Sequence, residues 1–311
     1  MKIAIFLLLC SSIFAREKKV LICGVCRNVE QAAANTIANI EALGNRFADY
    51  AVIIYENNST DGTARCYQEW AQTNPHVIFI SEMVPDIQLS PSRTERIARA
   101  RNRVLSVARG EEYSEFDYLI MVDLDFLCPW PIEEILKTIE LPLEWDCIAA
   151  NGLIGDQYSD HYALRDRTFP LGPEMVGSFW WKESWADYRL EGDELLPVYS
   201  AFGGLAIYKM SSMLPFSYSG TVTEDLSLFY REILSSMAEE HPHAKRYRIE
   251  IGKGYTCELS ELPIRFQRNT KAESPKLYRD PTCCEHLPLH ASMAVHGFGK
   301  IYINPKLLLH Y

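Results

Sequence analysis

Hydrophobic positions along the chain follow two different periods in turn. Apolar runs that fit a strand occur at 20–26, 50–55, 77–80 and 118–122, and between them lie stretches at 29–43, 63–71 and 92–108 with helical spacing. Strands and helices that alternate in this way are typical of a parallel sheet covered by helices. The third of these helices has a predicted start, because Ser92 is followed three residues later by Glu95, as in a capping box. We therefore expect an α/β fold.

The second half of the chain has a weaker pattern. Residues 132–139, 224–237 and 285–295 fit helices, and residues 145–151, 200–209 and 301–303 fit strands. Between them, residues 152–196 are rich in Gly, Pro, Tyr and Trp, which predicts a loop-rich insertion that shapes a pocket. Its Trp180, Trp181 and Trp185 could stack on sugars or form local core. We expect one domain over residues 18–311, with this insertion in it.

Composition and charge exclude some classes of function. The chain has 311 residues, 48% of them hydrophobic and 23% charged, which is ordinary for a globular protein. Its formal net charge of −10 argues against a general nucleic-acid-binding protein, because affinity for the phosphate backbone needs a basic surface. We therefore expect no nucleic acid among its partners.

The first fifteen residues resemble a secretory signal peptide. A positive start at Lys2 precedes an apolar stretch, and Ala15 stands before the charged Arg16. An uncleaved membrane anchor and a buried first strand remain alternatives for residues 1–15. The leader favours the secretory pathway, in an ER- or Golgi-like lumen, or association with a membrane.

Nine cysteines fit such a compartment without fixing any pairing. Eight remain if Cys10 leaves with the leader, which suits oxidising conditions. Cys23 and Cys26 form a C-x-x-C motif, but they lie within a predicted strand, and no second pair has zinc-ribbon spacing. We therefore interpret both as core thiols.

Two carboxylates stand at the end of the strand predicted at 118–122. If extended geometry continues through Leu124, Asp123 and Asp125 project from the same face, because a strand alternates its side chains. Such a pair of oxygen ligands suits Mg²⁺ or Mn²⁺ that also holds a phosphate. The alternative is an ordinary turn former or helix cap at the end of a strand.

Further polar residues follow the earlier elements. Glu56 ends the second predicted strand and precedes a polar, Gly-containing turn at 57–63, which suits either a ribose or base contact or a plain tight turn. On the third predicted helix, Arg93, Arg96 and Arg99 share a face through their three-residue spacing. That face is either a solvated stripe or a set of forks for phosphate oxygens.

The order of these motifs resembles a known family. Asn-Asn-Ser-Thr-Asp-Gly-Thr at 57–63, Ala-Arg-Asn at 100–102 and Asp-Leu-Asp at 123–125 resemble the GT-A fold of nucleotide-sugar glycosyltransferases, in particular the family-two-like enzymes. Residues 200–209, Cys284-Glu-His286 and residues 297–305 look like the fungal capsule-associated, cryptococcal-type mannosyltransferase group. The resemblance covers residues 18–311 and implies a single Rossmann-like mixed sheet flanked by helices.

This resemblance implies an activity and roles for particular residues. Glu56 and Asp61 match positions that hold the base and ribose of the donor, and Arg101 matches one that supports the diphosphate and the first aspartate. Asp123 and Asp125 match the Mn²⁺ or Mg²⁺ and sugar-phosphate motif, with Asp125 essential for catalysis. The implied reaction transfers a hexose from a GDP- or UDP-sugar to a hydroxyl of a glycan or glycoconjugate acceptor, and the nearest resemblance implies mannose as that hexose.

The catalytic carboxylate and a third metal ligand are less constrained. Glu285 and Glu224 both fit the catalytic position, and both also fit the last position of a T-x-x-E capping box. We favour Glu285, since a glycine, a short strand and Pro305 follow it as in the family. His310 falls where the resemblance implies a metal ligand near the chain end, with His286, His290 and His296 as alternatives.

Two other classes of function fit part of the pattern. A nucleotidyltransferase would use a similar sheet and metal carboxylates, but the turn after the first strand, at 24–28, is a poor match to a glycine-rich phosphate loop. An inactive, sugar-binding protein of the same fold is the non-enzymatic alternative.

Overall fold

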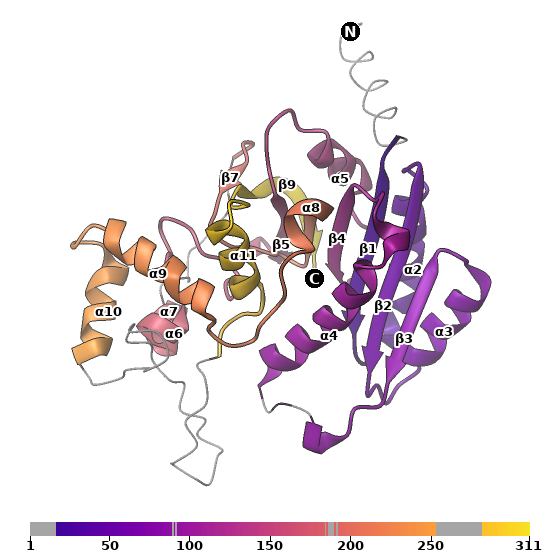
Figure 1. The fold of residues 1–311 in the computed structure, drawn as a ribbon, viewed down its shortest axis with the longest axis horizontal. Helices are drawn as coiled ribbons and strands as arrows, with labels where there is room; N and C mark the ends of the chain where they lie inside the picture. The colour runs from indigo at the N-terminus through magenta and orange to yellow at the C-terminus, as the bar shows by residue number, and fades with distance from the viewer. Residues whose placement is uncertain are drawn as a thin grey trace, which may run out of the picture.

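A mixed β-sheet runs through the whole molecule (Figure 1). The computed structural model describes residues 17–252 and 282–311, except 89, 91, 184, 186–189 and 191. Within this part the strand order is β3-β2-β1-β4-β8-β5-β9-β7, and β6 pairs with β5. The strands are β1 (Lys19–Cys26), β2 (Asp49–Asn57), β3 (Val77–Glu82), β4 (Tyr118–Asp123), β5 (Cys147–Ile154), β6 (Gln157–Tyr158), β7 (Leu196–Pro197), β8 (Leu205–Lys209) and β9 (Ile301–His310).

The sheet has a parallel half and a mixed half. Strands β3, β2, β1 and β4 are all parallel, as the alternating pattern of the sequence predicts. Beyond them, β8 is antiparallel to both β4 and β5, whereas β9 is parallel to β5. The expected α/β architecture with a mixed sheet is confirmed.

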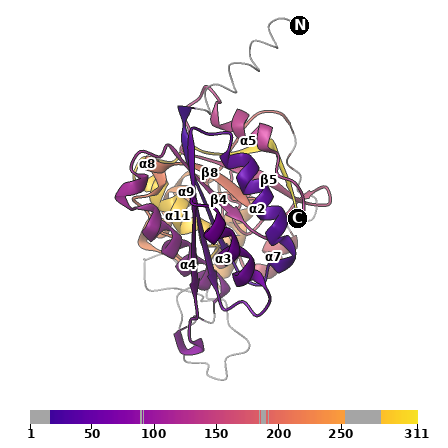
Figure 2. The same ribbon diagram turned by 90° about the vertical axis from the view of Figure 1, so that its right-hand side faces the viewer.

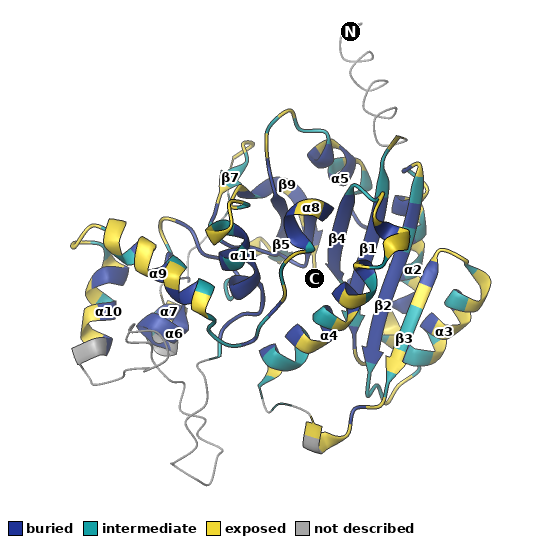
Figure 3. Ribbon diagram, viewed as in Figure 1, coloured by how far each residue is buried: buried dark blue, intermediate teal, exposed yellow. Residues whose placement is uncertain are grey.

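Helices cover both faces of the sheet (Figure 2). On β1, Leu21 and Cys23 pack into one core, against α4, α9 and α11, while Val20 and Ile22 pack into the other, against α2, α3 and α5. The central strands are buried from both sides, the edge strand β3 is partly exposed, and the outward surfaces of the helices are exposed (Figure 3). The helices are α2 (Glu30–Gly44), α3 (Thr63–Thr73), α4 (Arg93–Ala108), α5 (Ile132–Ile139), α6 (Pro173–Val176), α7 (Ser178–Glu183), α8 (Met210–Met213), α9 (Glu224–Ser236), α10 (Pro242–Gly252) and α11 (His286–Val295).

Several predicted boundaries need correction. Strand β8 begins at Leu205, five residues later than predicted, because Gly203 and Gly204 have the positive φ angles 63° and 82°. Strand β9 continues to His310 past Pro305, because a register shift opposite Ala150 lets the strand resume pairing beyond the proline. Helix α10 is not among the predicted elements.

Helix starts separate true caps from chance motifs. The predicted cap of α4 is confirmed, since Ser92 Oγ accepts a hydrogen bond from the backbone N–H of Glu95. Thr223, rather than Thr221, caps α9. Glu285 occupies the N-cap position of α11 and makes no capping hydrogen bond with its side chain, so its carboxylate is available for other contacts.

The insertion at 152–196 packs against the rest of the domain as local core. Trp185 stacks on Phe169 with ring centroids 3.8 Å apart, and Trp181 meets Trp185 edge-on at 6.0 Å. Both tryptophans are buried, and Trp180 is partly buried against the same core. The core interpretation of these three aromatic residues is therefore the one that their packing supports.

The described residues test only part of the predictions about the cysteines and the leader. Cys23 and Cys26 are buried free thiols, and burial raises the pKa of both well above the ordinary range, as expected for core cysteines. The predicted signal peptide, residues 1–15, lies outside the described residues. Among the described helices, none has the length and apolar character needed to cross a membrane.

Candidate functional site

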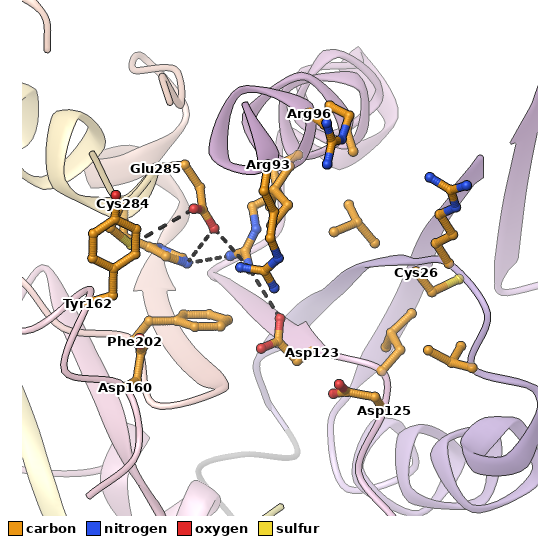
Figure 4. A pocket seen from close by; sticks show the side chains of 18 of the residues that line it. Cys26, Arg93, Arg96, Asp123, Asp125, Asp160, Tyr162, Phe202, Cys284 and Glu285 are labelled. Carbon is orange, nitrogen blue, oxygen red and sulfur yellow. Dashed lines mark hydrogen bonds and ion pairs between the residues drawn. The ribbon is translucent and has the colours of Figure 1, made fainter. Parts of the chain in front are cut away.

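A cavity of about 560 Å³ opens at the carboxyl ends of β1 and β4 (Figure 4). Its walls come from these strand ends, from α4, from the segment after β6, from the turn before β8 and from the start of α11. Ligands of open α/β sheets bind at the carboxyl ends of strands, where the loops leave room. Of the predicted site residues, Arg101, Asp123, Asp125 and Glu285 line this cavity together.

Arg101 joins the two halves of the site. Its guanidinium is buried, with Nη2 3.1 Å from Asp123 Oδ1 and 3.6 Å from Glu285 Oε1. It also lies over the ring of Phe202, 4.5 Å from the centroid. Burial opposes the charge of Arg101, but the nearby acidic groups, Glu285 foremost, hold its pKa above the ordinary value. The arginine therefore stays charged and binds both carboxylates.

The aspartate pair lies where strand alternation predicts. Asp123 and Asp125 both line the cavity, while Leu124 between them is buried in the core. Burial raises the pKa of Asp123 to about 7, against the opposing effect of Arg101, and its side chain remains 31% exposed. Tyr311 Oη also donates to Asp123 Oδ2 at 3.4 Å.

The two candidates for the catalytic carboxylate, Glu285 and Glu224, have different surroundings. Glu285 lines the cavity with 7% of its side chain exposed, beside Arg101 and 3.7 Å from Nε2 of His286. Glu224 is exposed at the start of α9 and does not line the cavity. The arrangement favours Glu285 over Glu224 as the functional carboxylate.

His286 acts as a neutral partner of Arg101. Nη1 of Arg101 donates to Nε2 of His286 at 2.5 Å, so that this ring nitrogen is the acceptor. Burial, with Arg101 next in effect, lowers the pKa of His286 well below the ordinary value. Its ring stacks on Phe202, with centroids 4.0 Å apart. These contacts hold Arg101 in place without adding charge.

The cavity contains residues that the sequence did not reveal. Asp160 accepts hydrogen bonds from the backbone N–H groups of Gly203 (3.0 Å) and Ala163 (3.3 Å), and burial raises its pKa. Tyr162 lines the cavity with it. The Gly203-Gly204 pair was a partial signal, because a Cβ on Gly203 would stand 2.1 Å from the carbonyl oxygen of Ala150.

Glu56 and Asp61 support the turn after β2. Glu56 is buried and accepts hydrogen bonds from Ser59 N and Ser81 Oγ, each 2.6 Å away. Asp61 accepts from the backbone N–H of Thr63, and hydrogen bonding by Thr63, its side chain foremost, lowers the pKa of this exposed carboxylate. Neither lines the cavity, although Asn57 of the same turn does. Their hydrogen bonds are those of a structured turn.

His310 is not brought to the cavity. It is an exposed residue near the end of β9, paired with Leu153, and the next residue, Tyr311, is the one that lines the cavity beside Asp123. No group of three or more His, Cys, Asp or Glu side chains in the described part of the chain is arranged as a metal site. The carboxylate oxygens of Asp123 and Asp125 are nevertheless the donor type that Mg²⁺ and Mn²⁺ prefer.

Comparisons with solved structures return glycosyltransferases at low identity. Mannosyl-3-phosphoglycerate synthase from Rubrobacter xylanophilus is 16% identical, with 72% of this chain and 67% of that chain covered and a TM-score of 0.43. A mannosyltransferase from Pyrobaculum calidifontis in complex with GDP-Man and Mn²⁺ is 15% identical, with 65% and 48% covered and a TM-score of 0.40. The chain spans about half the length of the first structures that it matches. No curated protein matches it.

A family model provides the assignment. The model described as glycosyl transferase family 2 matches residues 22–211, which is well over half of the chain and extends from within β1 to beyond β8. This range contains Arg101 and the aspartate pair, and its mixed sheet flanked by helices is that of the GT-A fold. The chain belongs to glycosyl transferase family 2.

Proposed function

We propose that this protein is a metal-dependent glycosyltransferase that moves a hexose from a nucleotide diphosphate sugar to a hydroxyl of a glycan or glycoconjugate. The observation that carries the proposal is the convergence of Asp123, Asp125, Arg101 and Glu285 on one cavity at the strand ends of a family 2 domain. Mannose from GDP-mannose is the donor implied by the motif resemblance. A secretory lumen or a membrane surface is the proposed location, supported by the leader sequence alone.

The proposed roles follow from charge and position. Asp123 and Asp125 would hold Mn²⁺ or Mg²⁺, which when bound supplies positive charge to the leaving diphosphate. Arg101, fixed by Asp123 and Glu285, keeps a positive charge beside the same site. In an inverting reaction Glu285 would accept the proton of the acceptor hydroxyl. In a retaining reaction it would only orient the reacting groups or stabilise the transition state. The motif resemblance gives Glu56 and Asp61 contacts with the base and ribose of the donor, and the turn that they stabilise brings Asn57 to the cavity.

A donor screen tests the proposal. The full chain is incubated with GDP- and UDP-sugars, with and without Mn²⁺, and release of the nucleoside diphosphate is measured with wild type and with Asp125→Ala. We expect Mn²⁺-dependent turnover of at least one donor by the wild type and its loss in the variant. If no donor is turned over and none binds in a metal-dependent way, the proposal fails, and an unchanged Asp125→Ala variant would favour a binding protein without this chemistry.

A further inference from the structure

The arginines of α4 fall into groups with different surroundings. Arg101 is buried, and two carboxylates bind its guanidinium. Arg99 donates to a backbone carbonyl in the turn before α4, Arg103 forms an ion pair with a carboxylate of β3, and neither lines the cavity. Arg93 and Arg96 do line it. The stripe seen in the sequence therefore divides, and only its first two members face the site.

Arg93 and Arg96 stand at the electrostatically unfavourable end of their helix. They occupy the first turn of α4, where the helix dipole already gives a partial positive charge. The two guanidinium groups are therefore repelled by this end of the helix. Arg27, after β1, lines the same cavity. None of these three arginines forms an ion pair with another described residue, although Arg96 donates to the backbone oxygen of Ser90 at 2.7 Å. No carboxylate of the described residues therefore pairs directly with their guanidinium groups.

The charges of the cavity are separated in space. In Figure 4, Arg93 and Arg96 descend from α4 on one side, and Asp123 and Asp125 lie on the opposite side. Arg101 lies with the carboxylates and is bound by them. An anion in the cavity would therefore meet unpaired guanidiniums from α4 and, across from them, the carboxylates proposed to hold the metal.

The first turn of α4 is held firmly in position. Thr94 Oγ1 donates to the backbone oxygen of Gly220 at 3.0 Å, and a Cβ on Gly220 would come within 2.2 Å of the backbone nitrogen of Glu95. Further along α4, Asn102 exchanges two hydrogen bonds with the backbone of Tyr218, at 2.9 and 2.8 Å. Binding an anion would therefore require little reordering of the helix, which favours affinity.

We propose that Arg93 and Arg96, assisted by Arg27, form a binding site for a phosphate-type anion on the α4 side of the cavity. Guanidinium groups bind phosphate oxygens through paired, charge-assisted hydrogen bonds, and a helix N-terminus adds to the attraction. The inference rests on the proposed function for the source of the anion, which is either the diphosphate of the donor or a phosphate carried by the acceptor. In either case the site does not need the metal to attract its ligand.

The test compares Arg93→Gln/Arg96→Gln with Arg99→Gln, a control on the same helix but outside the cavity. Binding of GDP, UDP and inorganic pyrophosphate to the full chain is measured by calorimetry in EDTA. Each charged hydrogen bond contributes about 1.5 kcal/mol or more, so we expect the double variant to lose at least about tenfold in affinity. Arg99→Gln should retain wild-type affinity. Arg93→Lys/Arg96→Lys, which keeps the charge, should recover part of the loss and provides the test if the glutamine variant does not fold.

The two sources of the anion, the donor and the acceptor, predict different results in these binding measurements. Weaker binding of GDP or UDP by the double variant assigns the site to the diphosphate of the donor. Unchanged GDP and UDP binding, with weaker binding of inorganic phosphate in the presence of saturating GDP, assigns it to the acceptor. If the double variant binds all of these anions like the wild type, or the wild type binds none, the inference is overturned. Donor turnover by the wild type is scored separately, so a failure of the proposed function is distinguishable from a failure of this site.

Discussion

Removal of the charge of Glu174 should destabilise the fold severely, because it would leave a buried arginine without its counter-ion. Arg165 and Glu174 are both fully buried, with Nη2 of the arginine 3.1 Å from Oε1 of the glutamate. Tyr230 donates its hydroxyl hydrogen to the same carboxylate, and Nη1 of Arg165 donates to the backbone oxygens of Tyr162 and Leu164. This network ties the insertion to α9.

The expected loss follows from distance and burial. Two unit charges 3.1 Å apart attract by about 5 kcal/mol at an effective dielectric constant of 20. In Glu174→Gln the amide oxygen can still accept one hydrogen bond, so part of the interaction survives. Breaking a buried pair from one side costs about 3–5 kcal/mol, and we expect a loss near 3 kcal/mol in the free energy of unfolding.

Urea denaturation followed by circular dichroism measures this loss. Glu144→Gln is the matched control, since Glu144 forms its ion pair with Lys300 at the exposed surface, where such pairs contribute little. In a double-mutant cycle, Arg165→Met/Glu174→Gln should be less destabilised than the sum of the single variants, because either change removes the same interaction. A Glu174→Gln protein within about 1 kcal/mol of wild type would refute the reasoning.

Two further predictions concern protonation and the catalytic carboxylate. Burial lowers the pKa of His243 to about 3, so the unfolded chain binds a proton below pH 6.5 that the folded chain does not, and this contribution to stability is lost as pH falls. Between pH 7 and pH 5 the wild type should therefore lose about 2 kcal/mol more than His243→Gln in urea unfolding, and parallel losses would contradict this. Donor turnover should fall by about 100-fold or more in Glu285→Gln if this group accepts the acceptor proton, and it should stay near wild type in Glu224→Gln. A larger loss in the second variant would reverse the assignment.

The parts of the site that the sequence predicted lie on regular elements or directly at their ends. Asp123 ends β4 and Asp125 follows it in the direction that strand alternation predicts, and Arg101 is on a helix whose N-cap the sequence shows. Such residues can be placed because the period of an element determines which side chains share a face. Glu285 was placed from the order of motifs, and its surroundings then distinguished it from Glu224.

The site residues that the sequence did not predict lie in segments without the regular period of a helix or strand. Asp160 and Tyr162 follow the two-residue strand β6, and their position depends on the Gly203 backbone from a segment more than forty residues later. At the chain end, the register shift within β9 determines that Tyr311, and not His310, contacts Asp123. A change of register exchanges the face on which each side chain lies, and Pro305 alone did not predict the size of this shift.

The acidic side chains that line the cavity support the proposed need for a cation. Asp123, Asp125, Asp160 and Glu285 line one cavity, and Arg101 forms ion pairs there with two of them, Asp123 and Glu285. Burial raises the pKa of Asp123 to about 7 and also raises that of Asp160, with neighbouring carboxylates adding to both shifts. Burial favours the neutral form of these carboxyl groups, whereas the repulsion between neighbouring carboxylates favours any added positive charge, a proton or a metal ion alike. A divalent cation would lower both pKa values and return the carboxylates to their charged form. A diphosphate that brought its negative charge without a cation would meet repulsion from these carboxylates and attraction from Arg27 and the α4 arginines. If the anion bound by these arginines is the diphosphate of the donor, the metal and the arginines act on the same ligand from opposite sides.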